Sequence, residues 1–139
     1  MSRHFTFAVV DDHPMVRRGI VEILLDQSDF RVLGEGGCAD DALQLAAEHN
    51  PNMMLLDVNM PGCGVAAAGL IRASYPQVRT TLFSFRQDLE VVRASFEAGA
   101  SGYIVKGISS VALIAAVRTM LAGETYLSQA LRERLNGDS

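Results

Sequence analysis

The sequence predicts an α/β domain built around a parallel β-sheet. Five short apolar runs rich in β-branched residues alternate along the chain with segments whose apolar residues recur at helical spacing. Strands that alternate with helices in this way pair in parallel through right-handed crossovers. The chain has 139 residues, 49% of them hydrophobic, which suits a single domain with a core of its own.

The predicted strands are short, apolar and bounded by polar or turn-forming residues. They comprise Phe5–Val10, Phe30–Glu35, Met53–Leu56, Arg79–Ser84 and Gly102–Val105. Met53–Leu56 is the most apolar of these runs, which predicts a central strand that is covered on both faces. Periodicity does not predict the order of the strands in the sheet.

Each predicted helix carries an apolar stripe and a start or stop signal. The helices comprise Pro14 to Leu24, Ala39–His49, Val65–Tyr75, Leu89–Ala98 and a last helix from a Ser109 or Ser110 cap to Leu121. Pro14 suits a first helical turn, and Gly99 is typical of a helix C-cap. The amphipathic stretch from Leu127 to Leu135 predicts an additional short C-terminal helix.

Composition excludes several classes of protein. The net charge is −4 and the pI is near 5.3, whereas nucleic-acid-binding surfaces are usually basic, so we do not expect this chain to bind DNA by itself. No apolar run approaches the roughly 18 residues that span a bilayer, and no signal-peptide pattern follows Met1, so we expect a cytoplasmic protein without membrane contact. Cys38 and Cys63 are far apart in sequence, form no CxxC motif and have no histidine at metal-ligand spacing. We therefore expect reduced thiols that are buried or half-buried.

Polar side chains stand at the carboxyl ends of four predicted strands. They are Asp11 and Asp12 after the first strand, Asp57 after the third, Ser84 at the end of the fourth and Lys106 after the fifth. Strand ends converge at one edge of a wound sheet, so we expect these side chains to meet. Clustered carboxylates raise one another's pKa unless a cation joins them, and Mg²⁺ prefers oxygen ligands. A cation, a lysine and a nucleophilic carboxylate are what phosphoryl transfer to an aspartate requires.

Taken singly, each of these residues has an ordinary structural explanation. An acidic pair after a strand is often a helix N-cap, and an aspartate shortly before Pro61 is usually a turn residue. A lone serine or lysine after a strand is usually solvated. The joint placement at four strand ends is what favours the phosphoryl-transfer interpretation.

The same residues closely resemble the motifs of receiver domains in bacterial two-component response regulators. The resemblance extends from about Phe5 to Leu121. It is carried by Val9-Val10-Asp11-Asp12-His13, by the LLDVNMPG stretch at 55–62, by Phe83-Ser84 and by the GASGYIVK stretch at 99–106. It implies a flavodoxin-like (CheY-like) fold, a doubly wound five-stranded parallel sheet of order 2-1-3-4-5 with five helices.

The resemblance also implies a role for each residue of the site. Asp57 would be the phosphoacceptor, and a sensor histidine kinase the donor. Ser84 and Lys106 would contact the phosphoryl group; Ser84 would move toward it, and Tyr103 would fill the vacated space. The domain would catalyse its own phosphorylation and slow dephosphorylation, and would not be an enzyme in any other sense. A cation, Mg²⁺ or Mn²⁺, would be held by Asp11, Asp12, Asp57 and the main-chain carbonyl of Asn59.

The residues after the last predicted helix, Ala122–Leu131, resemble the NarL/FixJ subfamily, in which a linker leads to a LuxR-type helix-turn-helix. We therefore expect a receiver domain at 1–122 and a C-terminal helix or linker at 123–139, toward an output domain absent from this chain. The protein would then regulate transcription, dimerise on phosphorylation and contact DNA only through that output domain. The alternative within the same fold is a stand-alone receiver that passes phosphate onward or binds a target protein.

Some residues depart from the common receiver pattern. Phe85 stands where many receivers carry a small residue, and its ring either crowds the phosphoryl pocket or packs under the following loop. We expect Asn59, Phe85 and Arg86 to tune the lifetime of the phosphorylated state, with Arg86 and Asn59 acting by control of the attacking water. Gly107 replaces a proline that follows a cis bond in many receivers, and we expect a trans bond here. His13 is not expected to bind the metal.

Two functions of other classes fit the sequence less well. A small Mg²⁺-dependent phosphatase with an aspartyl-phosphate intermediate would need a second carboxylate two residues after Asp57, where Asn59 stands. A flavin-binding protein would need a hydroxyl- and glycine-rich phosphate loop after the first strand. Asp11 and Asp12 in that loop would repel a phosphate.

Overall fold

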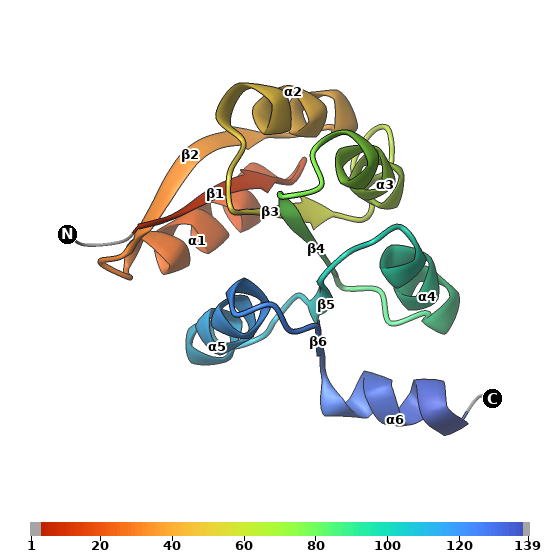
Figure 1. The fold of residues 1–139 in the computed structure, drawn as a ribbon. Coiled ribbons are helices and arrows are strands. Elements are labelled where there is room, and N and C mark those ends of the chain that lie inside the picture. Colours follow the sequence, from red (N-terminus) through yellow and green to blue (C-terminus); the bar gives the residue numbers. More distant parts are fainter. Residues whose placement is uncertain (1–3, 138–139) are drawn as a thin grey trace.

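The computed structural model describes residues 4–137, which form a six-stranded parallel sheet with helices on both faces (Figure 1). The strands are β1 (Phe5–Val10), β2 (Phe30–Gly36), β3 (Met53–Asp57), β4 (Arg79–Ser84), β5 (Gly102–Val105) and β6 (Tyr126–Leu127). The helices are α1 (Pro14–Leu25), α2 (Ala39–His49), α3 (Gly64–Ser74), α4 (Leu89–Glu97), α5 (Ser110–Leu121) and α6 (Gln129–Gly137). The strand order β2-β1-β3-β4-β5-β6 confirms the predicted order of the first five strands.

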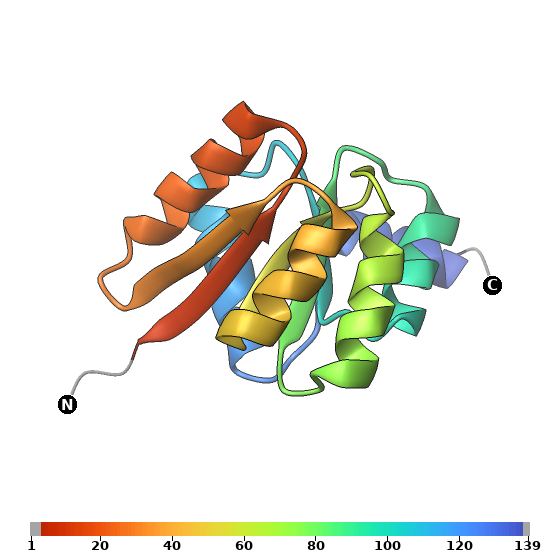
Figure 2. The ribbon, with the colours of Figure 1, turned by 90° about the horizontal axis from the view of Figure 1, so that it is seen from above.

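The two faces of the sheet form separate cores because neighbouring side chains of a strand point to opposite sides. On β1, Ala8 and Val10 belong to the core that α2, α3 and α4 cover, whereas Phe7 and Val9 belong to the core that α1 and α5 cover. Figure 2 shows α2 and α3 side by side over one face, with α1 over the other. All five residues of β3 are buried, which confirms it as the central apolar strand.

The start and stop signals work as predicted at most helix ends. The Ser109 side chain caps α5 by accepting a hydrogen bond from the Ala112 N–H at 3.1 Å. Asn50 ends α2 in the left-handed conformation, with φ of 46°, and Gly99 follows α4 with φ of 91°. The boundaries of α3 and α4 differ from the predicted ones by a residue, as is usual where helices fray.

The C-terminal segment contains one element that the sequence did not predict. Tyr126 and Leu127 add a short strand, β6, to the edge of β5, and α6 begins two residues later than predicted. Leu131 of α6 is only 1% exposed and packs in the same core as α4. A two-residue strand carries too little periodicity to be recognised from sequence.

The peptide bond before Gly107, the two thiols and the apolar character of the helices can also be compared with the predictions. Between residues 4 and 137 the peptide bonds are trans, including the one before Gly107. Cys38 is half-buried, as predicted. Cys63 is exposed because it lies in the turn before α3, so the prediction of a buried or half-buried thiol is wrong there. Among the described helices, none combines the length and apolar character needed to cross a bilayer.

Candidate functional site

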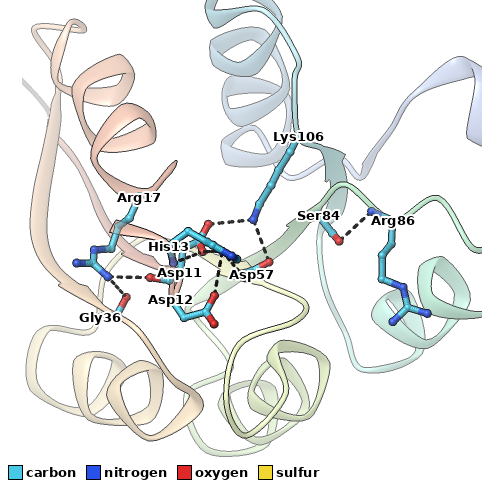
Figure 3. A network of polar contacts seen from close by, with 9 residues as sticks. All are labelled: Asp11, Asp12, His13, Arg17, Gly36, Asp57, Ser84, Arg86 and Lys106. Atoms are coloured by element: carbon cyan, nitrogen blue, oxygen red, sulfur yellow. Dashed lines mark hydrogen bonds and ion pairs between the residues drawn. The ribbon is translucent and has the colours of Figure 1, made fainter. Parts of the chain in front are cut away.

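The carboxyl ends of β1, β3, β4 and β5 bring the predicted residues to one edge of the sheet (Figure 3). Asp57 is the last residue of β3, and Asp11 directly follows β1, its neighbour in the sheet. Lys106 follows β5, and its side chain reaches across the end of β4 to both carboxylates. The parallel strands of one sheet therefore bring together three residues that are distant in sequence.

The Lys106 ammonium links the two buried carboxylates. Its Nζ lies 3.1 Å from Asp57 Oδ1 and 3.0 Å from Asp11 Oδ2. The side chains are 6% exposed for Lys106, 2% for Asp57 and 0% for Asp11, so the three charges are shielded from water. Phe83 and Phe85 flank the ammonium, with ring centroids at 5.0 and 5.5 Å. A cation in these surroundings can hold an anionic group beside Asp57.

Asp12 and His13 complete the acidic cluster on its solvent side. Asp12 is partly exposed, and His13 Nδ1 lies 3.1 Å from Oδ1 of both Asp11 and Asp12. The His13 ring is also 4.0 Å from Asp57 Oδ2. The sequence predicts no metal-binding role for His13, but its position directly after the acidic pair indicates that it lies close to those carboxylates.

The pKa values of the two inner carboxyls are shifted in opposite directions, although burial raises both. The pKa of Asp57 is raised, first because burial disfavours its charge and then because the carboxylate of Asp11 is close. Burial would also raise the pKa of Asp11, but the His13 N–H and the contacts with Lys106 outweigh it and hold that pKa below its ordinary value. Asp57 is therefore the more basic member of the buried pair.

The acidic cluster has the donor set of a divalent cation site. One ligand atom from each of Asp11, Asp12, His13 and Asp57 lies within 4.8 Å of the others. Asp57 Oδ2 is buried, yet accepts no hydrogen bond from any residue that the structure describes. A buried acceptor without a donor is costly, and a hard cation with oxygen ligands satisfies it. Mg²⁺ therefore fits the residues present.

The predicted switch pair lies beside the cluster at the β4–α4 loop. Ser84 is buried, and its Oγ accepts a hydrogen bond from the Arg86 N–H at 3.0 Å. Tyr103 is 1% exposed, and its hydroxyl donates to the Arg86 carbonyl at 2.8 Å. The sequence interpretation placed the Tyr103 ring inside only after Ser84 had moved, whereas here it is inside while Ser84 still holds the loop.

The three residues predicted to tune the phosphate's lifetime occupy different surroundings. Phe85 is 69% exposed, so it does not pack under the following loop but lies across Lys106 at the rim of the site. The Arg86 guanidinium pairs with Asp88, at 3.1 Å between Nη2 and Oδ2, and points away from the carboxylates (Figure 3). Asn59 is exposed in the loop after β3, where it lines an open groove with Arg86.

Two residues of the site escaped the sequence analysis. A Cβ on Gly64 would clash with the main-chain oxygen of Asp57, so only glycine lets the start of α3 approach β3 so closely. Arg17 of α1 donates from Nη1 to the main-chain carbonyl of Asp11 at 2.7 Å. Neither contact follows a local pattern, because each joins a side-chain position to a main-chain atom elsewhere in the sequence.

Comparison with known proteins agrees with this geometry. Residues 7–118 match the family model described as the response regulator receiver domain. The chain is 34% identical to the response regulator GacA of Pseudomonas aeruginosa over 128 residues, which are 91% of this chain and 60% of GacA. It is also 34% identical to the nitrate/nitrite response regulator protein NarL of Escherichia coli over 127 residues, 91% of this chain and 59% of NarL.

Solved structures give the same result. The crystal structure of a two-component response regulator of the LuxR family from Aurantimonas sp. SI85-9A1 matches with a TM-score of 0.91 and 29% identity, covering 97% of both chains. The signal receiver domain of the putative response regulator NarL from Mycobacterium tuberculosis matches with a TM-score of 0.85 and 30% identity, covering 88% of this chain and 99% of that one. The chain spans about 60% of the length of the curated relatives it matches. It belongs to the receiver domains of two-component response regulators, of the NarL/FixJ type that its motifs predicted.

Proposed function

We propose that this chain is a phosphorylation-controlled switch in which Asp57 accepts a phosphoryl group from a sensor histidine kinase. The observation that carries the proposal is the surroundings of Asp57. One of its carboxylate oxygens contacts Lys106, while the other is buried without a hydrogen-bond donor and faces the acidic cluster. Mg²⁺, or Mn²⁺ in its place, would be held by Asp11, Asp12, Asp57 and the main-chain carbonyl of Asn59.

The proposed reaction is an in-line transfer to a carboxylate. A carboxylate oxygen of Asp57 forms a bond to phosphorus while the bond from phosphorus to the donor nitrogen breaks, and the donor imidazole keeps the departing electron pair. When bound, the cation neutralises charge that develops on the phosphoryl oxygens. Lys106 supplies a second positive charge from the end of β5. Ser84, at the end of β4, would donate a hydrogen bond from its hydroxyl to a phosphoryl oxygen.

Of the acidic residues, Asp57 is best suited to be the nucleophile. Its pKa is raised by burial and then by Asp11, which makes its carboxylate more basic than that of Asp11. Asp11 Oδ1 is already occupied by the His13 N–H at 2.9 Å. Asp12 lies at the solvent side, away from the Lys106 contacts.

Intact-mass spectrometry after incubation with phosphoramidate or acetyl phosphate tests the proposed transfer. We expect a gain of one phosphoryl mass that requires Mg²⁺, disappears with EDTA and is absent in Asp57→Asn. A gain that persists in EDTA or in the variant would contradict the proposed site. If small donors give no gain, transfer from a purified histidine kinase decides, because Phe85 lies across Lys106 at the rim of the site.

The proposed output passes through the β4–α4 loop to α6. Ser84 and Tyr103 both contact Arg86, at its N–H and its carbonyl, and Arg134 of α6 donates to the Gln87 carbonyl at 3.0 Å. If Ser84 turns toward a phosphoryl oxygen, it releases the Arg86 N–H, and the loop loses one of these restraints. The change would then reach α6 through Gln87 and Arg134.

Hydrogen exchange measured with and without phosphorylation tests this route. We expect exchange in α6 to change on phosphorylation in the wild type and in Arg132→Met, but not in Arg134→Met. Arg132 is the matched control because it lies on the same helix and donates to Leu127 rather than to the loop. An identical response in all three proteins would exclude Arg134 as the connection.

We further propose a receiver domain at 1–122 and a C-terminal helix or linker at 123–139 that leads to a helix-turn-helix output domain. Residues 1–3 and 138–139 of this division lie outside the described residues. The length of the relatives supports it, since GacA and NarL extend well beyond the matched part. In that arrangement the whole protein dimerises on phosphorylation and contacts DNA through the output domain. Light scattering of the phosphorylated and unphosphorylated chain tests the dimer.

A further inference from the structure

Arg17 joins the acidic cluster to the edge of the sheet from the first turn of α1. Its Nη1 donates to the Asp11 carbonyl at 2.7 Å and lies 3.3 Å from the Gly36 carbonyl at the end of β2. Its Nε pairs with Glu35 Oε1 at 3.2 Å. Side chains in a helix point back toward its N-terminus, so a long residue in the first turn reaches the loop that precedes the helix.

These contacts fix the main chain that carries the acidic pair. The Asp11 N–H donates to the Gly36 carbonyl at 2.9 Å, and its carbonyl accepts from Arg17, so both peptide groups of Asp11 are held. The second of these groups is the peptide that joins Asp11 to Asp12. Its orientation sets the direction in which the Asp12 side chain leaves the backbone.

We propose that Arg17 is a positioning residue for the divalent cation, acting through the Asp11–Asp12 peptide and touching neither the cation nor the phosphoryl group. This inference rests on the proposed cation site at Asp11, Asp12 and Asp57. A planar guanidinium can donate to two carbonyls and a carboxylate at once, whereas the ammonium of a lysine is a point charge without this fork geometry.

The positive charge of Arg17 makes the inference sharply testable, because position and charge predict opposite effects. Arg17 is a cation near a cation site, so by Coulomb repulsion alone its removal would tighten metal binding. If its hydrogen bonds hold the ligands in place, its removal weakens binding instead. Residues that support metal ligands typically change affinity by about 10- to 100-fold.

Binding of Mn²⁺, measured as the loss of free Mn²⁺ by electron paramagnetic resonance, tests the proposal without phosphorylation. The proteins are the wild type, Arg17→Gln, Arg17→Lys, Arg18→Gln and Asp12→Asn. Arg18 is the matched control, since it is on the same helix and also reaches Glu35, at 3.4 Å, but its contacts do not include the Asp11 carbonyl. Thermal unfolding without metal establishes that each variant folds.

We expect both Arg17 variants to bind Mn²⁺ about tenfold more weakly or worse, and Arg18→Gln to stay within about twofold of the wild type. Unchanged or tighter binding by Arg17→Gln would overturn the proposal. If that variant does not fold, Arg17→Lys, which keeps the charge, decides in the same way. Failure of the wild type to bind, or equal binding by Asp12→Asn, would instead refute the proposed cation site itself.

Discussion

Replacing Lys106 by methionine removes the ammonium that compensates two buried carboxylates. Lys106 is the only lysine in the sequence, and its Nζ lies within 3.1 Å of both Asp57 and Asp11. Methionine keeps a similar length and can pack against Phe83 and Phe85, so the substitution removes the charge with little loss of volume.

The expected cost is large because the carboxylates left behind cannot reach water. Their side chains are 0% and 2% exposed. Removing one partner of a buried ion pair typically costs about 3–5 kcal/mol. We therefore expect Lys106→Met to lose about 3–5 kcal/mol of the free energy of unfolding at pH 7 without metal. For comparison, an ion pair exposed to solvent contributes only about 0–1 kcal/mol to the free energy of unfolding.

The loss should depend on pH with a definite sign. In the wild type, His13 and Lys106 hold the pKa of Asp11 below its ordinary value despite burial, so Asp11 stabilises the fold above that ordinary value and ceases to do so as the pH falls. Without Lys106, burial raises the pKa of both carboxyls, and the folded state binds more protons than the unfolded state. The deficit of the variant should then shrink as the pH approaches about 4.

Urea unfolding followed by circular dichroism measures these differences at pH 7 and at pH 4.5, with and without Mg²⁺. Added Mg²⁺ should recover part of the loss at pH 7, because a bound cation replaces the missing positive charge. Arg118→Met is the control for an ordinary ion pair, since Arg118 and Asp29 are 41% and 34% exposed. A deficit of about 1 kcal/mol or less, or one independent of both pH and Mg²⁺, would refute the reasoning.

Three further substitutions probe the same edge of the sheet, each by urea unfolding. Asp57→Asn leaves Lys106 paired with Asp11 and should stabilise the metal-free protein by about 1 kcal/mol at neutral pH, but not in acid. The reason is that burial, then Asp11, raises the pKa of Asp57, so its ionised form is disfavoured in the fold; a loss of stability would contradict this. Tyr103→Phe should cost about 1 kcal/mol and speed hydrogen exchange around Arg86, which loses the phenol donor; unchanged exchange would exclude the restraint. Gly64→Ala should cost about 2–3 kcal/mol, because its Cβ meets the main chain of Asp57. Gly19→Ala is the control, since nothing lies near its Cβ, and it should raise the free energy of unfolding by as much as about 1 kcal/mol. Equal effects of Gly64→Ala and Gly19→Ala would refute the clash.

The sequence predicted the elements and the central contacts well, for reasons that are local or topological. Alternating apolar runs predict strands and helices directly, and the Ser109 cap is a property of a few adjacent residues. The meeting of Asp11, Asp57 and Lys106 follows from topology, because each residue ends a strand and those strands share one edge.

The contacts that escaped prediction join side chains to main-chain atoms or depend on rotamers. The Arg17 contact with the Asp11 carbonyl requires the placement of α1 relative to β2, which periodicity does not give. Arg86 had a competing partner two residues away, Asp88, which neutralises it outside the site. Phe85 lies over Lys106 at the rim of the site, and the sequence could not choose between the two alternatives because they differ only in the direction of the side chain.

Chemical mapping of the phosphorylated residue tests the central claim most directly. Borohydride reduces an aspartyl phosphate to homoserine, and tandem mass spectrometry of the digested protein then locates that residue. After phosphorylation with Mg²⁺ and reduction, we predict homoserine at position 57, with Asp11 and Asp12 unchanged. Homoserine at 11 or 12, or a phosphorylated protein with no homoserine at 57, would contradict the assignment of Asp57 as the phosphoacceptor.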